Sequence, residues 1–311
     1  MQTIPLSQPG VHFRSPKKTR VASLTGPRCV REKPADRPQL RRPLGCKRGA
    51  RPVSTQVLGG LEAPLGGFLA QNPGLTYGVA ANTAVFLLGI RVLLSGLTWT
   101  GVFHSWLLGC SIYSAFGLGG YFLVCLYFIF GSLVTKVKLE QKKKEGIAEA
   151  RSGRRSLGSV WGSGIAGVFC AVMGLISGNF SFWQVGFVAS FGSKLSDTVS
   201  SEIGKAYGKT TYLVTTFERC PRGTEGAVSL EGTLAGFGAA LCYGLLAYAI
   251  GQVTLQGALI VFGACVAANL FESYLGASMQ GQIPWLTNDV VNMLQISVAA
   301  ALAISARSLL P

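Results

Sequence analysis

From about residue 74 to its end, the chain alternates long apolar stretches with short polar ones. A window of about 20 mostly apolar residues is long enough to cross a bilayer as a helix. Such windows predict spans at 74–96, 99–117, 118–135, 160–178, 181–201, 232–251, 254–271 and 291–309. The first block, 74–135, holds either two long or three short helices. We therefore expect an all-α, polytopic membrane helix bundle with about seven or eight spans.

Composition agrees with a protein that lies in lipid. The chain is 49% hydrophobic and 13% charged, whereas soluble domains are about 25% charged. Its net charge of +15 would favour a nucleic-acid partner if it were spread over the chain. However, 13 of the 28 Lys and Arg residues lie within the first 51 positions, beside only Glu32 and Asp36. We therefore expect no nucleic-acid partner, and the lipid bilayer is the expected surrounding.

The basic leader has no apolar core of the kind that a secretory signal needs. A leader rich in Arg and hydroxyl residues and poor in acids is typical of an organelle transit peptide. We predict that 1–61 is a disordered transit peptide with a linker, cleaved somewhere between about Ala22 and Leu61, and that 62–311 is the membrane domain. The alternative is a disordered basic tail that binds anionic lipid or nucleic acid.

Charge in the connections predicts the topology. The connection at 136–159 carries eight Lys or Arg residues against three Glu residues, so it should stay on the side where synthesis or import leaves it. Counting spans from there places 202–231 and 272–290 on that same side. The opposite connections, at 178–181 and 251–253, carry no charge. Nearly all ionisable groups of the membrane domain should then face the compartment from which a water-soluble reactant arrives.

Two polar, glycine-containing segments stand out: GSKLSDTVSSEIGKAYGK at 192–209 and ERCPRGTEGAVSLEGTLAG at 218–236. Carboxylates at the edge of a bilayer are costly to keep, so they indicate a functional site. The candidate catalytic residues are Asp197, Glu202, Glu225 and Glu231, of which Asp197 and Glu225 are the candidate metal ligands. The candidate phosphate-binding cations are Lys194, Lys205, Lys209, Arg219 and Arg222. Carboxylates for a divalent cation beside cations for phosphates suit phosphoryl transfer.

Asp197 has a structural alternative, because an ion pair with Lys194 would also account for a buried aspartate. Asp197 and Glu202 are five residues apart, which is about 140° around a regular helix. They would share one cation only if the helix unwinds, and Gly204 or Gly208 would permit such a break.

The second polar segment, at 218–236, is predicted to begin with a ligand-binding loop. Pro221 and several glycines disfavour a helix before about Glu231 and permit a tight backbone. Its candidate binding residues are Gly223, Thr224, Gly226 and Ser229. In the following span, Gly236, Gly238 and Ala239 are expected to serve helix packing. The phosphate-binding pattern GxxxxGK[ST] does not occur in the chain, so a soluble P-loop kinase fold is unsupported.

A third polar cluster follows at NLFESYLGA (269–277) and TNDVVN (287–292). Asn269 and Glu272 are three residues apart, as are Asp289 and Asn292, so each pair shares a helix face. We predict Asn269, Glu272 and Asp289 as binding residues. The alternatives are an interhelical hydrogen-bonded pair for the first two, and a helix N-cap for Asp289.

In these blocks the chain resembles the plastid phytyl-phosphate kinases of the vitamin E pathway. It also resembles the wider membrane family, formerly a domain of unknown function, that includes transmembrane protein nineteen of animals. The resemblance covers about residues 74–310. It implies transfer of a phosphoryl group from a nucleoside triphosphate to phytyl monophosphate, giving phytyl diphosphate for tocopherol synthesis and salvage of phytol from chlorophyll. It further implies a chloroplast membrane location, the envelope being favoured over the thylakoid.

More distant similarity to CTP-dependent polyprenol kinases implies CTP as donor, with Mg²⁺. The acceptor phosphate is already ionised near neutral pH, so the reaction needs no strong general base. We place the isoprenoid tail in a groove beside Trp161, Trp183 and Phe187. The alternatives are a phytol or polyprenol kinase, which needs a base, and a non-enzymatic transporter or assembly factor.

Overall fold

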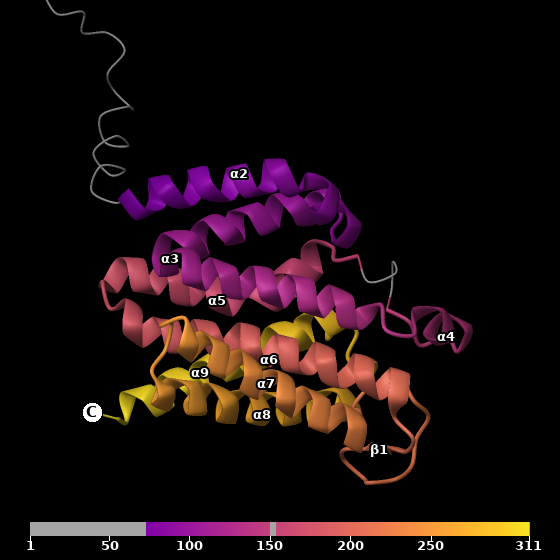
Figure 1. The fold of residues 1–311 in the computed structure, drawn as a ribbon. Coiled ribbons are helices and arrows are strands. Elements are labelled where there is room, and N and C mark those ends of the chain that lie inside the picture. Colours follow the sequence, from indigo (N-terminus) through magenta and orange to yellow (C-terminus); the bar gives the residue numbers. More distant parts are fainter. Residues whose placement is uncertain (1–72, 150–153, 311) are drawn as a thin grey trace, which may run out of the picture. The chain divides into compact units, whose positions relative to one another are not determined.

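The structure, a computed structural model, describes residues 73–149 and 154–310, so the predicted transit peptide lies outside the described residues. The helices are α2 (Pro73–Gly96), α3 (Trp99–Thr135), α4 (Leu139–Lys144), α5 (Leu157–Ser177), α6 (Phe180–Tyr207), α7 (Leu230–Ala249), α8 (Leu255–Ser278) and α9 (Asn288–Ser308). Two short antiparallel strands, β1 (Thr211–Leu213) and β2 (Ala227–Ser229), lie between α6 and α7. The long helices pack side by side (Figure 1), which confirms the predicted all-α bundle.

Helix α3 is folded back on itself at Gly117, which has φ 64° and ψ −161°, a conformation open mainly to glycine. The first half runs back along α2, with Gly78 against Ser114, and the second half returns until Phe128 lies against Gly96 (Figure 1). At 1.5 Å per residue, each half is about 27 Å long and so long enough to span a bilayer. The block at 74–135 therefore holds three short helices.

Among the described residues, six helices are long and apolar enough to cross a membrane, and α6 is not one of them. Counting α3 as two segments and adding α6 gives eight segments of membrane length, in agreement with the predicted seven or eight. Helix α6 fails the hydropathy test because its second half is polar. It can nevertheless lie at membrane depth because residues 185–196 are all buried by protein.

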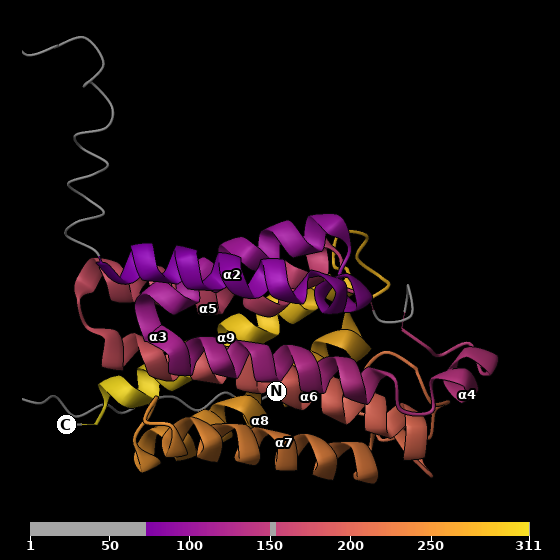
Figure 2. The ribbon, with the colours of Figure 1, turned by 45° about the horizontal axis from the view of Figure 1, so that its top comes forward.

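Helix α6 is the central helix, since it packs against α3, α5, α7, α8 and α9 (Figure 2). Its core-facing aromatic rings stack in series. The Phe187 ring lies 4.7 Å from that of Phe116 and 5.5 Å from that of Phe191, measured between centroids. Close approach of α7 depends on glycine, because a Cβ at Gly232 would lie 2.5 Å from the carbonyl oxygen of Ser200.

Of the three small residues predicted to serve packing in α7, two do so. A Cβ at Gly236 would lie 2.8 Å from the Ser200 Cβ, and Ala239 packs against the core. A Cβ at Gly238 would have no neighbour within 4 Å, so the packing role predicted for Gly238 is wrong: this position faces away from the bundle.

The three aromatic residues predicted to flank a groove for an isoprenoid tail do not surround one common space. Phe187 is fully buried in the core. The indole of Trp161 donates to Nδ1 of His104 at 3.2 Å, and that of Trp183 donates to Oγ of Ser177 at 3.0 Å. The three aromatic side chains therefore belong to separate packing contacts at different depths of the bundle.

The polar connections gather at one end of the bundle, as predicted. Residues 136–149, 154–156, 208–229 and 279–287 lie at that end, and the turns at 178–179 and 250–254 lie at the other (Figure 1). The first of these connections contains α4 and the second contains the β1–β2 pair. Neither element was predicted, because both are short and polar and are held by tertiary contacts.

Candidate active site

A cavity of about 590 Å³ opens at the polar end of the bundle, within the usual range for small-molecule sites. Most of the predicted site residues line it: Lys194, Asp197, Glu202, Lys205, Arg222, Gly223, Thr224, Glu225, Gly226, Ser229, Glu272 and Asp289. Its walls come from α3, α5, α6, α8 and α9 together with the connections before α5 and before α7. Three segments far apart in the sequence thus converge, as the sequence predicted.

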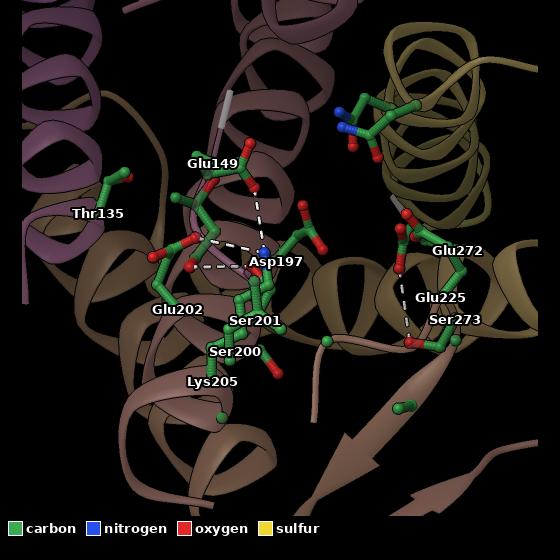
Figure 3. A pocket seen from close by; sticks show the side chains of 18 of the residues that line it. Thr135, Glu149, Asp197, Ser200, Ser201, Glu202, Lys205, Glu225, Glu272 and Ser273 are labelled. Atoms are coloured by element: carbon green, nitrogen blue, oxygen red, sulfur yellow. Dashed lines mark hydrogen bonds and ion pairs between the residues drawn. The ribbon is translucent and has the colours of Figure 1, made fainter. Parts of the chain in front are cut away.

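Three of the carboxylates that line this cavity come from different elements: Asp197 from α6, Glu272 from α8, and Glu225 from the loop before β2. In Figure 3, Glu225 and Glu272 lie on one side, Glu202 and Glu149 on the other, and Asp197 between them. Among the residues that the structure describes, no group of three or more His, Cys, Asp or Glu side chains is close enough to hold a metal ion alone.

Lys194 joins two walls of the cavity through a buried ammonium group. Its Nζ lies 2.5 Å from Oδ2 of Asp197 and donates to Oδ1 of Asn292, on α9, at 2.8 Å. The ion pair considered as the structural alternative for Asp197 is therefore present. The Asp197 side chain is still 13% exposed and lines the cavity, so the pair leaves one face of the carboxylate open to a ligand.

Glu202 is held on a different side of α6 from Asp197. It forms a buried ion pair with Lys142 of α4, each side chain being 1% exposed, and its other oxygen lies 3.5 Å from Nζ of Lys205. The helix stays regular through Tyr207, so the break that Gly204 would permit does not occur there. Without that break, Asp197 and Glu202 point to different parts of the cavity and do not share a cation site.

Lys205 also binds Glu149, with 3.2 Å between Nζ and Oε1. Partial burial alone would raise the pKa of Glu149, but the ammonium of Lys205, assisted by Lys194 and Lys142, outweighs it and lowers that pKa below its ordinary value. Glu149 therefore stays ionised and fixes Lys205 at the cavity wall.

The Glu225 carboxyl is in the opposite situation. Partial burial raises its pKa, and although Lys205 opposes the rise, the carboxylates of Glu149 and Asp197 add to it. Lys205 therefore compensates the charge of Glu225 only in part, as expected of a residue that binds a cation or accepts a proton.

The loop that carries Glu225 is held in place by two glycines and one arginine. Gly226 has φ 71°, and a Cβ there would lie 2.4 Å from the Ala277 Cβ; Gly223 has φ 85° and packs on Ile147. Arg222 donates to both oxygens of Glu145 at 2.9 and 3.0 Å. The loop is thereby fixed between α8 and the connection that follows α4, which explains its glycine-rich sequence.

Asp289 lies where α5 meets the start of α9. Its Oδ1 accepts a hydrogen bond from Oγ of Ser159 at 3.2 Å. The N-cap of α9 is Thr287, so the N-cap role considered for Asp289 is wrong. A Cβ at Gly158 would collide with the Asp289 carboxylate, so glycine on α5 makes room for this residue at the cavity.

Four predicted site residues do not line the cavity: Lys209, Arg219, Glu231 and Asn269. The Glu231 carboxylate accepts from the backbone N–H of Lys209 at 3.4 Å, and Arg219 pairs with Tyr212 within the strand region. Lys209, Arg219 and Glu231 therefore stabilise the hairpin and the start of α7, on the outer side of the loop.

Asn269 serves the bundle through an interhelical network. Its Nδ2 donates to Oγ of Ser196 at 2.8 Å, and its Oδ1 accepts from Gln295 at 2.7 Å. The alternative of an interhelical hydrogen bond is thus realised with partners on α6 and α9, and Glu272 is not the partner. Gln295 is fully buried and was not recognised in the sequence, since an isolated glutamine in a span carries no spacing signal.

Sequence reasoning also missed two arginines at the cavity, Arg154 and Arg155. The guanidinium of Arg155 lies 4.5 Å from the centroid of the Tyr127 ring and donates to its hydroxyl. The backbone N–H of Arg155 donates to the Gly96 carbonyl at 2.9 Å. Arg154 and Arg155 are adjacent basic residues in the connection at 136–159, where their charge predicts the topology of the loop but gives no sign of a binding role.

The fold and this cavity define a polytopic membrane protein with an ionisable ligand site at one membrane face. The chain belongs to the integral membrane protein family DUF92, which matches residues 82–300. It is 47% identical to the Arabidopsis thaliana protein named "Protein VTE6, chloroplastic" over 232 residues, which cover 73% of this chain and 70% of that one. The family resemblance drawn from the sequence motifs is therefore confirmed.

Two uncharacterized membrane proteins from microorganisms are also similar. The first, from Synechocystis, is 48% identical over 67% of this chain and 81% of its own length. The second, from Methanocaldococcus jannaschii, is 31% identical over 66% of this chain and 83% of its own length. No solved structure matches the chain.

Proposed function

We propose that the protein is a phytyl-phosphate kinase of a plastid membrane. It would transfer a phosphoryl group from a nucleoside triphosphate, CTP in our proposal, to phytyl monophosphate and so form phytyl diphosphate for tocopherol synthesis. The observation that carries this proposal is the convergence of Asp197, Glu225 and Glu272 with basic side chains in one cavity at the polar end of a membrane bundle. The similarity to a protein named as chloroplastic supports the plastid location.

The basic residues have the chemistry to hold phosphates. Arg154 and Arg155 line the cavity on the α5 side, and Lys205 and Arg222 on the side of α6 and the β1–β2 loop. Guanidinium groups bind phosphate oxygens in pairs, and ammonium groups act as point charges. Two phosphorylated substrates facing each other need positive charge on more than one wall, and these four residues supply it.

The carboxylates suit Mg²⁺ once phosphates are present. Mg²⁺ is usually held by one or two carboxylates together with substrate phosphates and water, so a site without three protein ligands fits it. Asp197 and Glu225, with Glu272 facing the same space, would hold the ion. When bound, it would neutralise charge on the phosphate oxygens of the donor.

The acceptor phosphate is the nucleophile, and it is ionised near neutral pH. The protein then has to orient two phosphates in line and exclude competing water. Gly223 and Gly226 bring the loop backbone to the cavity edge, where backbone N–H groups and the Thr224 hydroxyl can orient the donor.

A second candidate function, a phytol kinase, has one observation in its favour. The neutral alcohol would need a general base, and the raised pKa of Glu225 suits a carboxylate that accepts a proton. The richness of the cavity in cations favours the phosphate acceptor.

The test is to reconstitute the full chain in liposomes and follow phytyl monophosphate and, separately, phytol with CTP, ATP, UTP or GTP and Mg²⁺. We expect phytyl diphosphate from the monophosphate, with CTP the best donor. Phytyl monophosphate formed from phytol would assign the second function. No product from either acceptor, with protein shown to be folded, would overturn both and favour a transporter or assembly factor.

A further inference from the structure

A second cavity, of about 490 Å³, lies between α5 and α9 within the membrane-spanning part of the bundle. Almost all of its lining is apolar, including Ala166 and Phe169 from α5 and Ala300, Ala301 and Ile304 from α9. Phe169 is 55% exposed and Ala301 is also exposed. The cavity, which we call the α5–α9 groove, therefore opens sideways on the surface that contacts lipid.

The α5–α9 groove lies on two of the helices that line the polar cavity, further from the polar end of the bundle. On α5, Ser159 and Ser163 line the polar cavity, and Ala166 follows three residues later on the same helix face. On α9, Asp289 lines the polar cavity, and Ala300 of the groove follows eleven residues later, which is about three turns along nearly the same helix face. At 1.5 Å per residue, Ile304 lies about 18 Å below Asn292 along the helix.

Small residues create the space, and one aromatic ring borders it. Beneath the groove, Gly186 of α6 lies against Ile304, and a Cβ there would approach the Ile304 Cδ1 to 2.6 Å. Ala166 and Ala300 leave room between the two walls. Phe169 packs edge-on against Trp183, with 5.9 Å between ring centroids. The Phe169 ring therefore borders the space on the α5 side and is the α5 lining residue furthest from the polar end.

We propose that the α5–α9 groove holds the isoprenoid tail of the acceptor and that the tail enters it sideways from the bilayer. The identity of the headgroup rests on the proposed kinase function, but the apolar tail site does not. A single isoprenoid chain, anchored by a phosphate in the polar cavity, fits an apolar groove that lies deeper in the bundle on the same two helices. Phe169 then limits the length of tail that the protein accepts.

The test narrows the groove without disturbing the core. Ala301→Phe adds a ring to an exposed residue that lines the groove. Ala267→Phe is the matched control, because Ala267 is an exposed alanine of α8 that lines neither cavity. Both variants are made in the full chain, reconstituted in liposomes and compared in thermal stability with the unmodified protein.

The first measurement is photo-crosslinking with phytyl monophosphate that carries a diazirine at the end of its tail. We expect adducts on α5 and α9 that excess unlabelled phytyl monophosphate removes, a loss of at least tenfold in Ala301→Phe and no loss in Ala267→Phe. Adducts on other helices, or adducts that unlabelled phytyl monophosphate does not remove, would overturn the proposal, the latter because ordinary lipid then occupies the groove.

The second measurement compares turnover of phytyl and geranyl monophosphate. We expect Ala301→Phe to raise KM for the longer acceptor at least tenfold and to leave the shorter one unchanged, and Phe169→Ala to admit tails longer than phytyl. Equal effects on both acceptors would contradict the groove. Because crosslinking needs no turnover, specific adducts on α5 and α9 without any product would refute the kinase function and leave the groove in place.

Discussion

At the scale of single residues, Glu225 and Glu231 are six positions apart and lie in different surroundings. Glu225 faces the cavity with its charge only partly compensated, whereas Glu231 lies outside the cavity and accepts from the backbone of Lys209. We expect Glu225→Gln to lower kcat roughly 10²-fold, as the loss of one group that stabilises transition-state charge does. The measurement is phosphorylation of phytyl monophosphate in liposomes.

The matched control is Glu231→Gln, which removes the same charge outside the cavity. It should retain activity within about threefold, since it changes only a long contact at the start of α7. If the two variants lost activity equally, the assignment of Glu225 to the reacting phosphates would be wrong.

The raised pKa of Glu225 also predicts the pH dependence of activity. A carboxyl whose pKa is raised becomes protonated at a higher pH than an ordinary glutamate, whose pKa is about 4.3. As the pH falls through that raised pKa, the carboxylate is lost and kcat/KM should fall with it. Residual activity of Glu225→Gln should lack this acid limb. An identical limb in the variant would assign the titration to another group.

The stability of the folded protein should change with pH in the opposite direction to its activity. Because the pKa is raised in the folded protein, ionisation of Glu225 costs folded-state stability as the pH rises through it. Glu225→Gln should therefore unfold at the same temperature as the unmodified protein at pH 7, or at a higher one, so loss of activity will not reflect loss of fold.

Which residues face the cavity could be predicted only in part. The carboxylates and glycines were found because such residues are unexpected among spans. Arg155 was missed because its position depends on a backbone contact with Gly96, far away in sequence. Glu231 was wrongly included because a sequence shows that a carboxylate is near the membrane edge but not which side of a loop it occupies.

At the scale of elements, the Lys142–Glu202 ion pair fastens α4 to α6. Both side chains are 1% exposed, and Lys142 also donates to the Thr135 carbonyl at 2.8 Å. Removing one partner leaves the other charge buried and unpaired, which typically costs about 3–5 kcal/mol. We expect Lys142→Met and Glu202→Met each to lower the unfolding temperature in detergent clearly.

The double variant serves as the control for this pair. Replacing both charges by methionine removes the unpaired charge, so the double variant should be more stable than either single one. If the double variant instead lost as much stability as the two single variants together, the two side chains would not interact.

The helices that consist of a long apolar stretch could be predicted from the sequence, and the short or polar ones could not. The boundary between the predicted spans 99–117 and 118–135 coincides with the turn at Gly117. Of the two alternatives for 74–135, two long or three short helices, the structure has three short helices. Helix α4 was not found, because its six residues, LEQKKK, carry no apolar period and are ordered by the contact of Lys142 with α6. Helix α6 extends six residues beyond its predicted end at 201, because protein rather than lipid surrounds its polar half.

At the scale of the whole molecule, the eight segments make the topology testable. Phe217, which is 75% exposed, lies at the cavity end, and Leu309, which is 85% exposed, lies beyond α9 at the other end. In sealed vesicles, a membrane-impermeant maleimide should label Phe217→Cys and Leu309→Cys from opposite sides, above the background of the native cysteines. Labelling of both from one side would contradict three crossings, by α7, α8 and α9, between these two positions.

The arrangement of the spans could not be predicted from their hydropathy. Each span was found separately, but the position of α6 at the centre follows from the glycine contacts with α7 and from the aromatic stack around Phe187. These are contacts between side chains far apart in sequence, and no local pattern encodes them.

Between residues 73 and 310 the chain has an even number of membrane-length segments, so both ends of this part lie on the same side of the membrane. Helix α2 begins and helix α9 ends at the end of the bundle away from the cavity (Figure 1). A reporter fused to the C-terminal end would therefore reside on the side of the membrane opposite the cavity. An affinity tag placed there leaves the cavity clear, but a soluble enzyme fused there would be separated by the bilayer from any water-soluble ligand that enters the cavity.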